Sequence, residues 1–126
     1  MIEALFNQPN YVAAKKLLGA TELQQEAIAS NLGAIELPGY KRVQVNPAFL
    51  QQLQEAVRTQ DNNQIQSVTP QIEEDPDAVS SRLDGNNVVM EKEVLHLMQT
   101  NVEHALETQL VTGNLLRLRL AITGHA

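Results

Sequence analysis

Glu93 and His96 are the residues of this 126-residue sequence whose spacing comes closest to a known chemical site. A Glu-x-x-His pair places two ligands on one face of a helix, as in helical di-iron proteins. Such a site also needs a second pair of this kind and two more inward-facing carboxylates. The helix expected in the N-terminal third of the chain supplies Glu22 and Glu26 but no His. We therefore predict that no metal is bound, and metal analysis of the pure protein would test the alternative of a small helical metalloenzyme.

The other candidate bases and nucleophiles form no catalytic set. His104 lies in an apolar stripe beside Glu103 and Glu107, where we expect a packed and hydrogen-bonded side chain, because a general base needs a nucleophile within reach. Cysteine is absent, which excludes disulfides, thiol catalysis and cysteine zinc sites. The sequence also lacks a Gly-rich phosphate loop and a nucleophile elbow. We predict no catalytic residue, no cofactor and no small-molecule substrate, and hence no enzyme.

The charge balance argues against a nucleic-acid partner. Nine Lys and Arg residues stand against fifteen Asp and Glu residues, for a net charge of -6. A nucleic-acid surface needs a basic patch that replaces phosphate counterions. The pairs Lys15-Lys16 and Lys41-Arg42 are too few and too far apart to form one, so we interpret them as solvated charges.

Two long proline-free stretches predict the elements that must position these residues. The first helix is expected over about 10–32, after the start signal of Pro9 and Asn10. The second is expected over about 88–122, with Asn87 as a candidate cap and Gly124 as a stop. With only 3% aromatic residues, the chain suits helix-on-helix packing better than a sandwich or barrel.

The second helix carries more apolar surface than one partner helix can cover. One stripe runs from Met90 through Leu97 and Val111 to Ile122, and a neighbouring stripe runs from Leu95 to Leu116. An uncovered apolar patch on a small protein usually marks an interaction surface. Folding back of the middle segment over this patch is the alternative. Gly113 interrupts the stripes, either because a neighbouring helix approaches closely or as a tolerated weak point.

The middle of the chain, about 33–86, is expected to be polar and irregular. Val43–Val45 and Ile65–Val68 could be short strands, and Pro47–Arg58 could be a short helix. Residues 72–81 are acidic and contain Pro76, which indicates an extended or mobile loop. The predicted fold is therefore mainly α: one domain whose long terminal helices pack as a coiled-coil-like hairpin around a polar irregular middle segment.

Two segments resemble bacterial flagellar axial proteins. Ala29-Ser30-Asn31-Leu32, followed by Leu37-Pro38-Gly39-Tyr40-Lys41, is similar to the Ala-Ser-Asn-(Ile/Leu)-Ala-Asn and Thr-Pro-Gly-Tyr signature of that class. Gly33-Ala34 and Leu37 depart from the usual residues. The passage Asp84-Gly85-Asn86-Asn87-Val88-Val89-Met90-Glu91-Lys92-Glu93 is similar to the Asp-Gly-Asn-Asn-Val-Asp-Leu-Asp-Xaa-Glu passage of the rod protein B family, with Val89 in place of Asp.

The resemblance implies a structural subunit of the proximal flagellar rod that transmits torque and continues the export channel. It implies export to the basal body without a cleaved signal peptide. The implied partners are other copies of the chain, other proximal rod proteins, the rod-base junction protein, the export-gate proteins and the membrane base ring. The alternatives are another proximal rod protein, or a cytosolic helical adaptor or export chaperone.

We expect two groups of residues to serve assembly. The first group is apolar and lies on the two long helices: Leu18, Ile28, Leu32, Leu97, Val111, Leu115, Leu118 and Ile122. The second group forms a bend that stops the first helix: Asn31, Pro38, Gly39 and Tyr40. Pro38 disfavours helical geometry at the residue before it, and Gly39 permits positive φ. Asn31, near the helix end, could satisfy terminal carbonyls.

Overall fold

The computed structural model describes residues 8–80 and 82–124, and the side chain of Leu118 also lies outside the description. The described chain is mainly helical, as predicted, and ends in a long helix. The elements in chain order are α2 (Pro9–Gly33), β1 (Val43–Val45), α3 (Ala48–Thr59), α4 (Asn62–Ser67), β2 (Ile72–Glu74) and α5 (Met90–Thr123).

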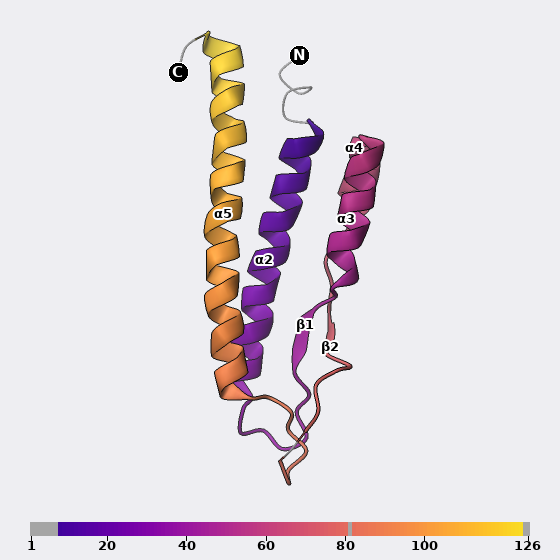
Figure 1. Cartoon of the computed structure of the whole chain (residues 1–126), viewed down its shortest axis with the longest axis vertical. Coiled ribbons are helices and arrows are strands. Elements are labelled where there is room, and N and C mark those ends of the chain that lie inside the picture. Colours follow the sequence, from indigo (N-terminus) through magenta and orange to yellow (C-terminus); the bar gives the residue numbers. More distant parts are fainter. Residues whose placement is uncertain (1–7, 81, 125–126) are drawn as a thin grey trace.

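Helix α2 is the central element. It lies antiparallel beside α5 on one side, and α3 and α4 lie on its other side (Figure 1). The first residue of α2 is Pro9. Proline suits the first helical turn, because N–H groups there have no acceptor within the helix and proline therefore loses no hydrogen bond. The helix ends at Gly33, before the Pro38-Gly39 pair that was expected to stop it. That expectation is corrected: residues 34–37 lie in turns between the end of the helix and Pro38.

The apolar core lies between α2 and the middle segment rather than between the two long helices. Its members are Val12, Ala20, Phe49, Leu53, Ala56 and Ile65. Helix α3 contributes Phe49, Leu53 and Ala56 from one face, because residues three and four apart share a face. The expected irregular middle segment is therefore largely ordered. Its few apolar side chains suffice because they come from α3 and α4 and converge on one side of α2.

Two local predictions in this segment are confirmed and one is wrong. Val43–Val45 is a strand, and the short helix expected over Pro47–Arg58 is α3. Ile65–Val68, expected to be a strand, instead lies at the end of helix α4 (Asn62–Ser67) and its cap. The Asp61 side chain accepts the N–H of Asn63 at the start of this helix, and fully buried Ile65 faces the core. Short apolar runs do not separate helix from strand by periodicity.

Strands β1 and β2 form an antiparallel pair with Val43 opposite Glu74 and Val45 opposite Ile72. Part of the acidic loop predicted over 72–81 is thus a strand. The pair lies at the end of the molecule where α2 ends and α5 begins (Figure 1). In the described part of the chain no helix is long and apolar enough to cross a membrane.

The contact between α2 and α5 is polar along much of its length. The Thr21 hydroxyl hydrogen bonds to the Glu107 carboxylate, and Gln25 donates to Asn101 over 3.1 Å. The imidazole of His104 lies 3.8 Å from a carboxylate oxygen of Glu22, which gives His104 a partner on the neighbouring helix. Burial raises the pKa of Glu107 above its usual value, although the Thr21 hydroxyl opposes this shift.

Candidate functional site

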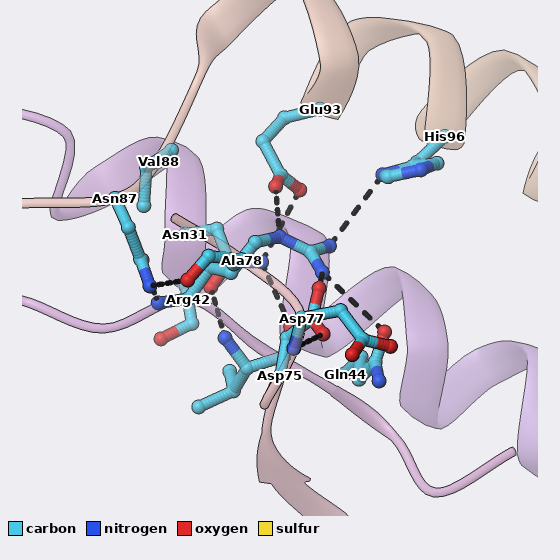
Figure 2. Close-up of polar contacts among 12 residues, drawn as sticks. Asn31, Arg42, Gln44, Asp75, Asp77, Ala78, Asn87, Val88, Glu93 and His96 are labelled. Atoms are coloured by element: carbon cyan, nitrogen blue, oxygen red, sulfur yellow. Dashed lines mark hydrogen bonds and ion pairs between the residues drawn. The ribbon is translucent and has the colours of Figure 1, made fainter. Parts of the chain in front are cut away.

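The end of α2, the strand β1 and the start of α5 meet in a buried cluster, the polar junction. Its members are Asn31, Tyr40, Arg42, Asp75, Asn86, Asn87, Glu93 and His96. Figure 2 shows three of them, Asp75, Glu93 and His96, around the guanidinium of Arg42. Glu93, Asn31 and Asn86 have no exposed surface. Because buried polar groups are costly unless hydrogen-bonded, the geometry of this cluster is tightly specified.

Arg42 is the centre of the junction. Its Nε lies 2.6 Å from Oε1 of Glu93, and its Nη1 lies 2.6 Å from Oδ2 of Asp75. Burial alone would lower the pKa of Arg42, but the hydrogen bonds and charges of Glu93 and Asp75 outweigh it and the net direction is upward. The interpretation of Arg42 as a solvated charge is therefore wrong. Arg42 follows Lys41, which is exposed, and the sequence indicates a surface pair, but the Arg42 side chain is buried.

Asp75 follows β2 and completes the ion-pair chain. Burial would raise its pKa, but the backbone N–H of Asp77 and the guanidinium of Arg42 stabilise the carboxylate, and the net pKa is below the usual value. The backbone N–H of Asp75 also donates to the carbonyl of Arg42 over 3.1 Å. Asp75 thus fixes both the backbone and the side chain of Arg42.

Asn31 binds the backbone of β1 and the carboxylate of α5 together. Its Oδ1 accepts the N–H of Val43 at 2.8 Å, and its Nδ2 donates to the carbonyl of Val43 at 2.9 Å and to Glu93 at 3.2 Å. The Tyr40 hydroxyl also donates to Asn31. The expectation that Asn31 satisfies terminal carbonyls of its own helix is therefore wrong. Asn31 instead pairs with strand β1 and with helix α5.

Asn86 performs the role that was expected of Asn31. Its Nδ2 lies within 3.0 Å of the carbonyls of Ala34, Ile35 and Leu37, which follow the end of α2. Its Oδ1 accepts the N–H of Val88 at 2.8 Å. One amide side chain thus anchors the turn after α2 to the segment that leads into α5.

Asn87 does not cap α5. The helix begins at Met90 after Val89, with no capping hydrogen bond from a side chain. The Oδ1 of Asn87 instead accepts the backbone N–H of Arg42 at 2.7 Å, and its own N–H donates to the carbonyl of Tyr40. Asn87 therefore pairs with the backbone of Tyr40 and Arg42, which lie far away in the sequence, and no local pattern could have indicated this.

Glu93 and His96, the pair with di-iron spacing, both lie beside the guanidinium of Arg42. The guanidinium of Arg42 contacts Glu93, and its Nη2 lies 3.5 Å from Nδ1 of His96 (Figure 2). A cavity of about 350 Å³ opens beside them, lined by Asp75, Asp77 and Lys92 among others. Among the described residues no three His, Cys, Asp or Glu side chains are grouped so as to hold a metal ion.

The bend residues occupy distinct positions. Gly39 has a φ of +75° and its N–H donates to the carbonyl of Asp84 at 2.8 Å, so the need for positive φ is confirmed. Pro38 is exposed. Tyr40 is half-buried and reaches Asn31 and Ser30 through its hydroxyl. Two bend residues, Asn31 and Tyr40, therefore belong to the polar junction, and Gly39 connects the two segments that carry the family resemblance.

The apolar residues expected at the assembly interface differ in exposure. Ile28 has no exposed surface, so it contributes to the interior of the chain rather than to a surface that a partner could contact. Leu18, Leu32, Leu97 and Val111 are half-buried. Leu115 and Ile122 are exposed at 41% and 51%. Leu118 lies within α5, but its side chain is outside the described part of the structure.

Helix α5 presents an exposed apolar surface away from α2, which we call the outer face. Its members are Leu95, Met98, Val102, Leu106, Leu110, Leu116 and Leu120, each about half exposed or more. The residues that α5 turns inward lie at other positions: Glu93, Leu97, Thr100, His104, Glu107, Val111 and Asn114 are all buried or half-buried. The two sets are offset by two residues, which corresponds to opposite sides of a helix.

Comparison with known proteins adds no assignment. No protein-family model matches the chain, and no curated protein matches its sequence.

Proposed function

We propose that this chain is a structural subunit of the proximal rod of the bacterial flagellar basal body. In this proposal the two long helices form a coiled-coil-like hairpin unit that packs against neighbouring subunits, transmits torque and continues the export channel. The outer face of α5 is the observation that carries the proposal. Seven large apolar side chains on one helix face are costly to leave in water, since burying each would contribute roughly 1.5–3 kcal/mol.

The polar junction supports the resemblance from which the rod assignment comes. The two similar segments, 29–41 and 84–93, are far apart in the sequence, yet their residues bind one another. Asn31 donates to Glu93, and Asn87 donates from its N–H to the carbonyl of Tyr40. A joint that holds the terminal helices in one fixed relation is what a subunit that transmits torque would require.

The proposal places the chain in the basal body after export, with copies of itself, other proximal rod proteins and the rod-base junction protein as neighbours. The export-gate proteins and the membrane base ring are its further proposed partners. It assigns no enzymatic activity, cofactor or small-molecule substrate. The polar junction in this reading is a structural joint, and the outer face of α5 is the assembly surface.

The test is incorporation into purified basal bodies. A tagged wild-type chain should appear in basal bodies from the bacterium that encodes it, and deletion of the gene should abolish motility. Leu116→Asp should be made and exported but not incorporated, because it places a carboxylate in the proposed contact. Leu50→Asp is the matched control, since Leu50 is 49% exposed on α3 and Leu116 is 57% exposed on α5.

Two outcomes would contradict the proposal. Incorporation of Leu116→Asp at the wild-type level would show that the outer face is not the assembly surface. A wild-type chain that stays in the cytosol and is missing from basal bodies would instead support a helical adaptor or export chaperone.

A further inference from the structure

The exposed side of α5 also carries a heptad stripe, the seam, which shares Val102, Leu106, Leu116 and Leu120 with the outer face. Between residues 99 and 120 the positions Gln99, Val102, Leu106, Gln109, Gly113, Leu116 and Leu120 recur at alternating steps of three and four. That spacing is the heptad repeat of a two-helix seam. All of these residues are exposed except Gly113, which is half-buried. Figure 1 shows α3 and α4 on the far side of α2, away from α5.

We infer that this seam of α5 binds the same seam of α5 in a second copy of this chain, with the two helices antiparallel and centred on residue 111. In this register residue i of one copy lies opposite residue 222 minus i of the other. Val102 then lies opposite Leu120, and Leu106 lies opposite Leu116. Every layer of the seam joins an a position to a d position, as antiparallel pairing of heptads requires.

Side-chain size supports the antiparallel register. It places Gln109 of one copy against Gly113 of the other, so the longer side chain fills the space that glycine leaves. A Cβ at Gly113 would meet nothing within 4 Å in its own chain, which means that no packing within the described chain requires glycine there. A parallel pair would instead place Gly113 against Gly113 and Gln109 against Gln109, with a gap in one layer and two amides in the next.

Charge supports the same register. Glu103 and Arg117 occupy equivalent flanking positions of the heptad, and the antiparallel pair brings Glu103 of each copy beside Arg117 of the other. Both residues are exposed. Within the described residues neither forms an ion pair, and Glu103 has the like charge of Glu107 nearby. A parallel pair would place neither residue beside an opposite charge.

This pairing concerns the isolated protein and does not depend on the proposed role in the rod. Sedimentation equilibrium of the purified full-length chain should show a monomer–dimer equilibrium. Glu103→Arg and Arg117→Glu should each weaken dimerisation about tenfold, because each replaces two attractive pairs by two repulsive ones. The double variant Glu103→Arg/Arg117→Glu should restore the wild-type dissociation constant. Circular dichroism of all three variants should match the wild type, since both positions are exposed.

A distance measurement fixes the orientation. The chain has no cysteine, so Gln99→Cys provides a single site for a spin label. The antiparallel register separates the two labels of a dimer by about 36 Å, from 24 residues at 1.5 Å each. An in-register parallel dimer would bring them within about 10 Å. A chain that stays monomeric at several hundred micromolar, a short label distance, or a charge swap that fails to restore association would overturn the inference. Rod incorporation is measured separately, so either result can fail without the other.

Discussion

Asn31 and Glu93, 62 residues apart in the sequence, share a hydrogen bond of 3.2 Å from Nδ2 to Oε2, and both are fully buried. One residue lies near the end of α2 and the other near the start of α5. The bond therefore joins the two long helices at the end of the molecule where the chain connects them. The remaining oxygen of Glu93 is held by Arg42, so the carboxylate has a partner on each side.

Replacing Asn31 by Asp should destabilise the protein by about 2–4 kcal/mol, because it removes donors to Val43 and Glu93 and places a second carboxylate beside Glu93. Urea unfolding at pH 7 measures this change. Ser30→Ala is the control: Ser30 is exposed and has only a 3.1 Å contact with the Tyr40 hydroxyl. An Asn31→Asp variant as stable as Ser30→Ala would contradict the role given to this amide.

Arg42→Met should cost about 3–5 kcal/mol, since it leaves the buried Glu93 carboxylate without its cation. Glu93→Gln in the wild-type background should also destabilise the chain. In the double variant the second substitution should cost less than it does alone, because the unpaired charge is gone. The readout is the coupling free energy of the double-mutant cycle. A coupling near zero would mean that Arg42 and Glu93 do not stabilise one another.

Asn86→Ala should release the turn after α2 and cost about 2–3 kcal/mol, because three backbone carbonyls lose a shared donor. Amide hydrogen exchange should accelerate locally, at the N–H groups of Val88, of residues 34–37 and of Gly39. Exchange in α3 should change only through global stability. Asn114→Ala is the matched control, because Asn114 donates only to Leu110 within its own helix.

Gly39→Ala should destabilise the chain by about 1–2 kcal/mol, because φ is +75° there and a Cβ strains that conformation. Gly33→Ala is the matched control, since Gly33 has ordinary φ and open space around it. It should be neutral or raise stability, as alanine restricts the unfolded chain. Adding Pro38→Ala to Gly39→Ala should also impair rod assembly under the proposed function, and normal swimming of such a strain would argue against a role for the bend.

Asp75→Asn should lower stability at neutral pH by about 1–2 kcal/mol, the size of one charged hydrogen bond. The pKa of Asp75 is lowered in the folded state. Its carboxylate therefore stabilises the fold fully above the unfolded value, near 3.8, and this contribution is lost as pH falls through the folded pKa. The stability difference between wild type and variant should be constant from pH 7 to about pH 5 and shrink in stronger acid. Denaturant titrations across this range would reveal a pH-independent difference if the assignment is wrong.

Local patterns were sufficient to locate the long helices. Proline positions bounded them, and the pattern placed their ends within two residues of Pro9–Gly33 and Met90–Thr123. The sequence also identified α3, because apolar residues at steps of three and four on a short segment have one clear interpretation. It predicted a wide apolar surface on the C-terminal helix, since such a surface is a property of one helix and needs no knowledge of its neighbours.

Only the tertiary structure decided which polar residues are buried. Arg42 follows Lys41, and Asn86 and Asn87 follow a Gly in a turn, so each resembles an ordinary surface residue in its local setting. Their main partners lie 33–52 residues away. The structure also moved the core to the α3 side of α2 and left the outer face of α5 uncovered. The physical reason is that helix periodicity is set by neighbouring residues along the chain, whereas burial of a charge depends on partners that only the folded chain brings together.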